Sequence, residues 1–144
     1  RRIGPFIGQQ KKWAAMFDRL MTWASHKQIL QCSRMDYFTI FRDDLNNTKF
    51  EKFKYDECLS VPNGTQAEND IGIEEIPAGQ YAVAKFEIDA HEFENAWNMM
   101  FREWLLSSGY QPTLDFCFER YLNDPKLHPK GKHIVEINIP VKPL

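Results

Sequence analysis

Residues 81–105, which read YAVAKFEIDAHEFENAWNMMFREWL, combine a strand pattern with a helix pattern. Residues 81–86 are rich in aromatic and β-branched side chains, which favours a strand. Apolar side chains then recur at the spacing of one helix face, at Phe93, Ala96, Trp97, Met100, Phe101, Trp104 and Leu105. Asp89 and Glu92 have the spacing of a capping box before this helix, and Gly109 is placed to end it. The stretch therefore predicts a strand followed by a long helix that faces a core.

The N-terminal half carries the same succession of patterns. A second helical stripe consists of Trp13, Met16, Phe17, Leu20, Met21 and Ala24. Strand patterns cover residues 37–41, 55–61, 116–121 and 133–141. With a short strand before Gly4, each half has the order strand, helix, strand, strand, and repeats of this length indicate a duplicated module. We predict an α+β fold: a duplicated βαββ module with pseudo-twofold symmetry, in which antiparallel sheets and two long helices surround a central cleft.

The chain length fits a single domain. The 144 residues have a mass of 17.0 kDa, and folding a chain of this size buries about 69% of its unfolded surface. We expect one domain over residues 1–144, with a first half at 1–62, a linker at 63–71 and a second half at 72–144. The chain begins with Arg1 and shows no signal peptide, so we expect a cytoplasmic fragment of a longer protein.

The composition argues against several classes of protein. Hydrophobic residues make up 43% of the chain and charged residues 26%, and the mean hydropathy is −0.52. No apolar run approaches the roughly 20 residues of a membrane span, so no membrane partner is expected. The net charge of −2 argues against direct DNA binding by this segment. Three widely separated cysteines without a C-x-x-C motif are typical of reduced thiols.

Metal, cofactor and nucleophile motifs do not occur in the sequence. The four histidines lack metal-ligand spacing, and neither of the glycine-rich phosphate-binding motifs is present. No serine lies in a G-x-S-x-G motif. We therefore expect no metal and no cofactor, and we assign no catalytic residue from these patterns.

Residues 116–121, FCFERY, form the segment with the most candidate functional side chains. On a strand, Glu119 and Tyr121 share one face with Cys117, whereas Arg120 lies on the other. If the face of Glu119 is outside, Glu119 is a solvated carboxylate. If it lines a cleft, Glu119 lies beside Tyr121, and its pKa should be raised by burial and lowered again when a cation binds. The alternation leaves both orientations open.

Several short segments together carry a family resemblance. They are residues 76–83 (IPAGQYAV), 108–110 (SGY), 117–125 (CFERYLNDP) and 136–141 (EINIPV). In order and spacing they closely resemble the gyrase-inhibitor-like small-molecule-binding domain, which also forms the effector-binding part of Rob-type and AraC-type transcription regulators. In the N-terminal half, residues 4–6 (GPF) and the helix ending at Trp23 and Ala24 fit the same family. The resemblance covers nearly the whole chain.

The resemblance implies a cleft between the two halves that binds lipophilic, often cationic, compounds. It also implies that Glu119 is the partner of the cation, with Tyr121 beside it. The aromatic candidates for the cleft are Tyr37, Phe38, Tyr81, Trp97 and Trp104. Residues 85–87 (KFE) stand where many relatives carry a His-x-Gly, and this departure concerns one edge of the cleft.

Three functions remain open at this point. We favour a multidrug-binding, ligand-sensing domain of a bacterial AraC-type transcription regulator, with DNA bound only through an upstream domain. The first alternative is a stand-alone protein that sequesters toxins or inhibits gyrase. The second is a hydrolase of electrophilic small molecules, with Glu119 as base and Tyr121 as hydrogen-bond donor. The residues favour binding over catalysis and indicate no oligomeric state.

Overall fold

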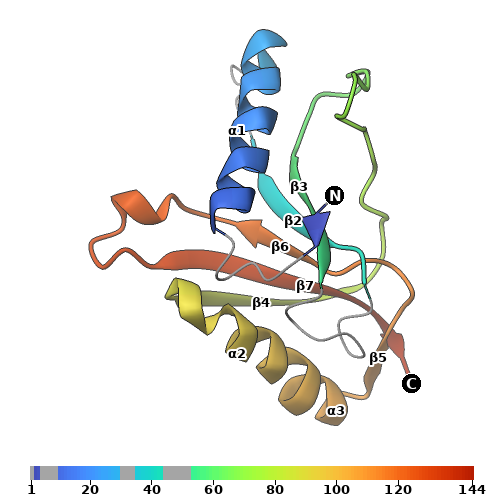
Figure 1. Cartoon of the computed structure of the whole chain (residues 1–144). Coiled ribbons are helices and arrows are strands. Elements are labelled where there is room, and N and C mark those ends of the chain that lie inside the picture. The colour runs from blue at the N-terminus through green and yellow to red at the C-terminus, as the bar shows by residue number, and fades with distance from the viewer. Residues whose placement is uncertain (1, 4–9, 30–34, 44–52) are drawn as a thin grey trace.

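The computed structural model describes residues 2–3, 10–29, 35–43 and 53–144 (Figure 1). The strands are β1 (Arg2–Ile3), β2 (Tyr37–Phe41), β3 (Lys54–Leu59), β4 (Tyr81–Ile88), β5 (Tyr110–Pro112), β6 (Phe118–Tyr121) and β7 (His133–Pro143). The helices are α1 (Gln10–His26), α2 (Phe93–Asn98) and α3 (Leu105–Ser107), with a π-helical segment, η4 (Met99–Trp104), between the last two. Short 3₁₀ turns lie at η3 (Ala90–Glu92) and η5 (Pro125–Leu127). Within the described ranges, no helix has both the length and the apolar character needed to cross a membrane.

The described strands form one antiparallel sheet. Its order is β1-β3-β2-β6-β7-β4, and β5 pairs with the C-terminal end of β7. Strand β2 of the first half pairs with β6 of the second, so that Thr39 lies opposite Glu119. The prediction of separate antiparallel sheets is therefore wrong. Pairing β2 with β6 satisfies the backbone groups of both inner edges and joins the two halves in one sheet.

The α+β class is confirmed. The first half contributes its strands in the order β1-β3-β2, and the second half continues the sheet in the order β6-β7-β4. The duplication of a βαββ module and the pseudo-twofold symmetry stay predictions.

The helices pack on one face of the sheet, which we call the helical face. One cluster joins Leu20, Trp23 and Ala24 of α1 to Leu59 and Tyr37 of the sheet. A larger cluster joins Phe93, Trp97 and Met100 to Val135, Ile137 and Ile139 of β7. Tyr37 pairs with Tyr121, and Tyr121 pairs with Val135, so both clusters lie on the same side of the sheet. The opposite face carries Phe38, Ile40, Phe118, Arg120 and Asn138.

The second predicted helix is present, but its middle is π-helical. A π-turn holds more residues than an α-turn, so it rotates the side chains that follow it relative to the expected stripe. Leu105 is buried, whereas Trp104 is 41% exposed. The prediction that Trp104 belongs to the core-facing stripe is therefore wrong. The predicted start is confirmed, because the backbone N–H of Asp89 donates to the Glu92 carboxylate at 2.9 Å.

Candidate functional site

Glu119 is buried at the centre of the sheet. It lies on β6 between β2 and β7, opposite Thr39 on one side and Ile137 on the other. Its side chain is only 1% exposed. Of the two orientations that the alternating pattern left open, the structure has the one in which this carboxylate faces the interior, on the helical face. A buried carboxylate must be compensated by hydrogen bonds, by a cation or by a proton.

The hydrogen-bond partners of Glu119 in the described part of the chain are neutral. The indole N–H of Trp97, on α2, donates to Oε1 at 3.2 Å. The hydroxyl of Tyr121, two residues along β6, donates to Oε2 at 3.2 Å. Arg120, the neighbour in sequence, points to the opposite face, where it forms ion pairs with Asp36 and Glu136. The nearest guanidinium along the chain therefore neutralises other carboxylates.

Burial changes the acidity of this carboxyl group. Removal from water raises the pKa of Glu119 from 4.5 to about 7, while the hydrogen bonds from Trp97 and Tyr121 act in the opposite direction. Burial and the nearby Glu119 carboxylate also raise the pKa of the Tyr121 hydroxyl, which therefore stays protonated. Near neutral pH, Glu119 is thus a group whose charge is easily changed by what lies beside it.

The hydrogen bonds continue from Tyr121 to two residues that the sequence analysis did not find. The hydroxyls of Tyr121 and Thr39 are in hydrogen-bond contact, and the Thr39 hydroxyl donates to Oε1 of Glu57 at 2.8 Å. Thr39 is fully buried and Glu57 is half-buried. Alternation within β2 or β3 shows only which residues of the same strand share a face with Thr39 or Glu57. The pairing of β3 with β2 and of β2 with β6 brings these two residues to Glu119.

The structure separates the aromatic candidates into three groups. Trp97 contacts Glu119 directly, and Tyr37 lies on the helical face beside Tyr121, with its ring packed on Phe17. Phe38 and Tyr81 lie on the opposite face, where both rings pack against Phe118. Trp104 is partly exposed on the helix. Glu119, Tyr121, Trp97 and Tyr37 are therefore the sequence candidates that the fold gathers together.

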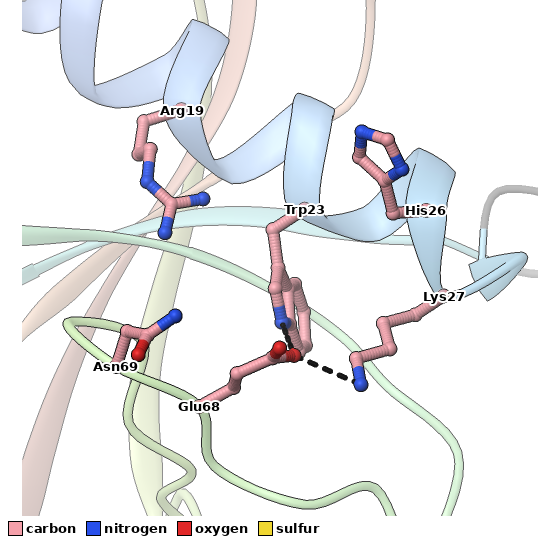
Figure 2. A pocket seen from close by; sticks show the side chains of 6 residues that line it. All are labelled: Arg19, Trp23, His26, Lys27, Glu68 and Asn69. Atoms are coloured by element: carbon pink, nitrogen blue, oxygen red, sulfur yellow. Dashed lines mark hydrogen bonds and ion pairs between the residues drawn. The ribbon is translucent and has the colours of Figure 1, made fainter.

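A cavity of about 380 Å³ lies between α1 and the connection from β3 to β4 (Figure 2). Its lining residues are Arg19, Trp23, His26, Lys27, Glu68 and Asn69, and Glu119 is not among them. Glu68 accepts a hydrogen bond from the Trp23 indole and an ion pair from Lys27, and Arg19 pairs with Asp70. These contacts attach the connection between β3 and β4 to α1. They also pair the charged groups of Arg19, Lys27 and Glu68 within the protein, so these groups are not available to a ligand.

Three potential metal ligands meet where the second helix begins. Ligand atoms of Asp89, His91 and Glu92 lie within 4.8 Å of one another. The Glu92 carboxylate already accepts the backbone N–H of Asp89 as a helix cap. We interpret this group as a capping structure, because such carboxylates are favourable at a helix start without a metal.

A Trp97→Phe variant tests the contact between the helix and the carboxylate. We expect the pKa of Glu119 to rise above about 7, because the variant removes a donor that stabilises the ionised form. A carboxyl-carbon NMR titration of labelled glutamates measures this value. Phe101→Leu is the control, since Phe101 stacks on Trp97 and lies outside the hydrogen bonds of Glu119. Equal pKa values in the two variants would contradict the prediction.

The sheet, the two helices and the buried carboxylate define the class of protein. It is an α+β binding domain in which an interior acidic group on the sheet faces the helices. The family model of the GyrI-like small molecule binding domain matches residues 1–142, and the chain belongs to this family. The resemblance found in the sequence is thereby confirmed.

Three relatives illustrate the similarity. The chain is 30% identical to a DNA gyrase inhibitor of Citrobacter koseri over 143 residues, which cover 97% of this chain and 87% of that protein. It is 33% identical over 143 residues to a DNA gyrase inhibitor of Salmonella arizonae, with the same coverage of both chains. A DNA gyrase inhibitor of Escherichia coli K12 is 33% identical over 125 residues, which cover 85% of this chain and 76% of that protein.

Proposed function

We propose that this domain binds lipophilic cationic small molecules on the helical face of the sheet, with Glu119 as the residue that neutralises the cation. The observation that supports this most directly is a 1% exposed carboxylate whose described partners, Trp97 and Tyr121, are neutral. An added positive charge stabilises such a group strongly, because the low local dielectric weakens the attraction of a cation much less than water does. Membership of a small molecule binding family agrees with this proposal.

The two hydrophobic clusters suggest where the ligand enters. Tyr37 packs against the cluster beneath α1, and its strand partner Tyr121 packs against the cluster beneath α2. The boundary between the clusters therefore runs beside Glu119. A lipophilic cation inserted there would contact the rings of Tyr37 and Trp97, which adds cation–π attraction to the ion pair. Phe38, Tyr81 and Trp104 have no part in this proposal, because of where the fold places them.

Tryptophan fluorescence tests the proposed function. Tetraphenylphosphonium is a lipophilic cation without a titratable group, and triphenylphosphine oxide is a neutral analogue with similar rings. We expect the cation to quench the fluorescence, because a cation bound at Glu119 lies close to the Trp97 indole. The expected dissociation constant is on the order of 10 μM. The neutral compound should bind more weakly. Equal affinity for both compounds would overturn the role of Glu119 as the group that neutralises the cation.

The biological setting of the binding domain is a second part of the proposal. The relatives are named DNA gyrase inhibitors, and this favours the stand-alone, gyrase-inhibitor-like alternative over an AraC-type regulator. A supercoiling assay with purified gyrase, with and without the cation, distinguishes the two settings. Loss of supercoiling activity supports the stand-alone alternative, and undiminished activity supports the regulator. The hydrolase alternative stays a prediction.

A further inference from the structure

Four polar side chains form a continuous hydrogen-bonded chain across three neighbouring strands. Glu119 and Tyr121 lie on β6, Thr39 on β2 and Glu57 on β3. Tyr121 bonds to Glu119 at 3.2 Å, Tyr121 and Thr39 contact each other through their hydroxyls, and Thr39 bonds to Glu57 at 2.8 Å. The chain thus has a carboxyl group at each end and two hydroxyl groups between them.

The number of protons in this chain determines whether all its links can form. Each hydroxyl supplies one proton, and an ionised carboxylate supplies none. With both carboxylates ionised, two protons serve three links, so two oxygens face each other without a proton between them. One additional proton on either carboxyl group fills all three links. Because buried hydrogen-bonding groups are costly to leave unsatisfied, the geometry favours one shared proton.

The two ends of the chain differ in exposure. Glu119 is 1% exposed, whereas Glu57 is half-buried. The negative charge is therefore better solvated on Glu57, and in the ligand-free protein the proton rests on Glu119. In that state the Glu119 carboxyl donates to Tyr121, Tyr121 donates to Thr39, and Thr39 donates to Glu57. The bond from Tyr121 to Glu119 described above is the direction that applies when Glu119 is ionised. If Glu119 is ionised instead, all three bonds reverse and the proton is on Glu57.

Several described side chains that pack around these four residues carry no charge at neutral pH. They are Tyr37, Val135, Ile137 and Trp97, which lie beside Tyr121, Glu119 or Thr39 in the sheet or on α2. On α1, the charged groups Arg19 and Lys27 are paired with Asp70 and Glu68.

We propose that Glu57 is a second carboxylate of the cation site, which shares one proton with Glu119 through the hydroxyls of Tyr121 and Thr39. The cation part of this inference rests on the proposed function, whereas the shared proton is a property of the ligand-free protein. When a cation binds beside Glu119, the carboxyl proton passes to Tyr121, the proton of Tyr121 to Thr39, and the proton of Thr39 to Glu57. Glu57 then releases it to a buffer base in the solvent. The bound positive charge thereby replaces one proton.

The shared proton is tested without any ligand, by carboxyl-carbon NMR titration of Glu119. We expect Glu57→Gln to lower the pKa of Glu119 by about one pH unit, the size that defines coupled sites. The amide of the introduced glutamine can donate to Thr39, so all links then form with Glu119 ionised. Glu87→Gln, at an exposed position on the opposite face of β4, should leave the value unchanged.

A double-mutant cycle separates the hydrogen-bonded path from attraction through space. Thr39→Val removes the middle hydroxyl at nearly constant shape, and the effect of Glu57→Gln should be largely lost in this background. Thr39→Ser keeps a hydroxyl and should restore the effect, which excludes a loss caused by disturbed folding. The proposal of a shared proton would be overturned by either of two results. One is an equal change in the pKa of Glu119 with and without the Thr39 hydroxyl, and the other is no change on Glu57→Gln.

Calorimetry with tetraphenylphosphonium tests the replacement of the proton. Titrations at about pH 6 in buffers of different ionisation enthalpy should show release of about one proton per cation by the natural protein, and about half of that by Glu57→Gln. Equal release by both proteins would overturn the role of Glu57. If the cation does not bind at all, the proposed function fails, and the NMR titration still decides whether the proton is shared.

Discussion

A Glu119→Gln variant is expected to bind tetraphenylphosphonium about 100-fold more weakly than the natural protein. The amide keeps the shape of the side chain but removes its negative charge, so the cation is left without a counter-charge in the interior. Truncating one partner of a buried charge pair costs about 2–5 kcal/mol, and about 1.4 kcal/mol corresponds to a tenfold change in affinity. The fluorescence titration described above measures both dissociation constants.

Two controls make this result specific to the charge. Triphenylphosphine oxide should bind Glu119→Gln and the natural protein with similar affinity, because it brings no charge into the site. Glu87→Gln removes an exposed carboxylate and should leave the affinity for the cation unchanged. A parallel loss of affinity for the cation and the neutral compound would instead indicate damaged packing, and the ion-pair argument would fail.

The free energy of unfolding of the ligand-free protein is expected to fall by about 2 kcal/mol as the pH rises from about 5 to about 7.5. The pKa of Glu119 is raised from 4.5 in the unfolded chain to about 7 in the fold. Between these values the folded protein binds more protons than the unfolded chain. Stability from this group is therefore fully present below 4.5 and is lost as the pH passes through about 7.

Urea denaturation of the natural protein and of Glu119→Gln, each followed across this range, measures the effect. The variant should show a much flatter dependence on pH and greater stability near pH 7.5, because it never ionises in the interior. His133 acts in the opposite direction, since burial lowers its pKa, but it is present in both proteins and cancels in the difference. Two parallel curves would show that Glu119 is not the group responsible.

The local sequence was sufficient for most of the elements. The helical stripes predicted both long helices, and alternation with β-branched and aromatic residues predicted β2, β3, β4, β6 and β7. The wrong prediction at Trp104 has a local cause. The residue types do not distinguish a π-helical segment from an α-helix, but the two have different numbers of residues per turn. The separate sheets were mispredicted because strand pairing between the two halves depends on contacts far apart in the chain.

The site divides along the same line. Glu119 and Tyr121 are two residues apart on a strand, so a common face follows from the chain geometry alone. Neither spacing nor composition connects them to Thr39, which lies more than half the chain length away in sequence, or to Glu57, which is closer but still far along the chain. Likewise, nothing local shows that Phe38 lies on the other side of the sheet from Tyr121. Its place follows from the register, in which Phe38 is opposite Arg120.

Three properties follow from the amino-acid sequence alone: the α+β class, the family, and the presence of an acidic and an aromatic hydroxyl side chain on one strand face. These properties depend on residue order and on periodicities within a single element. Three others depend on the folded chain: this face is the buried one, Trp97 donates to Glu119, and Thr39 and Glu57 extend the hydrogen bonds. The reason is physical: a strand's alternation defines two faces, but burial and cross-strand contacts depend on which elements pack there, and this is a property of the whole fold.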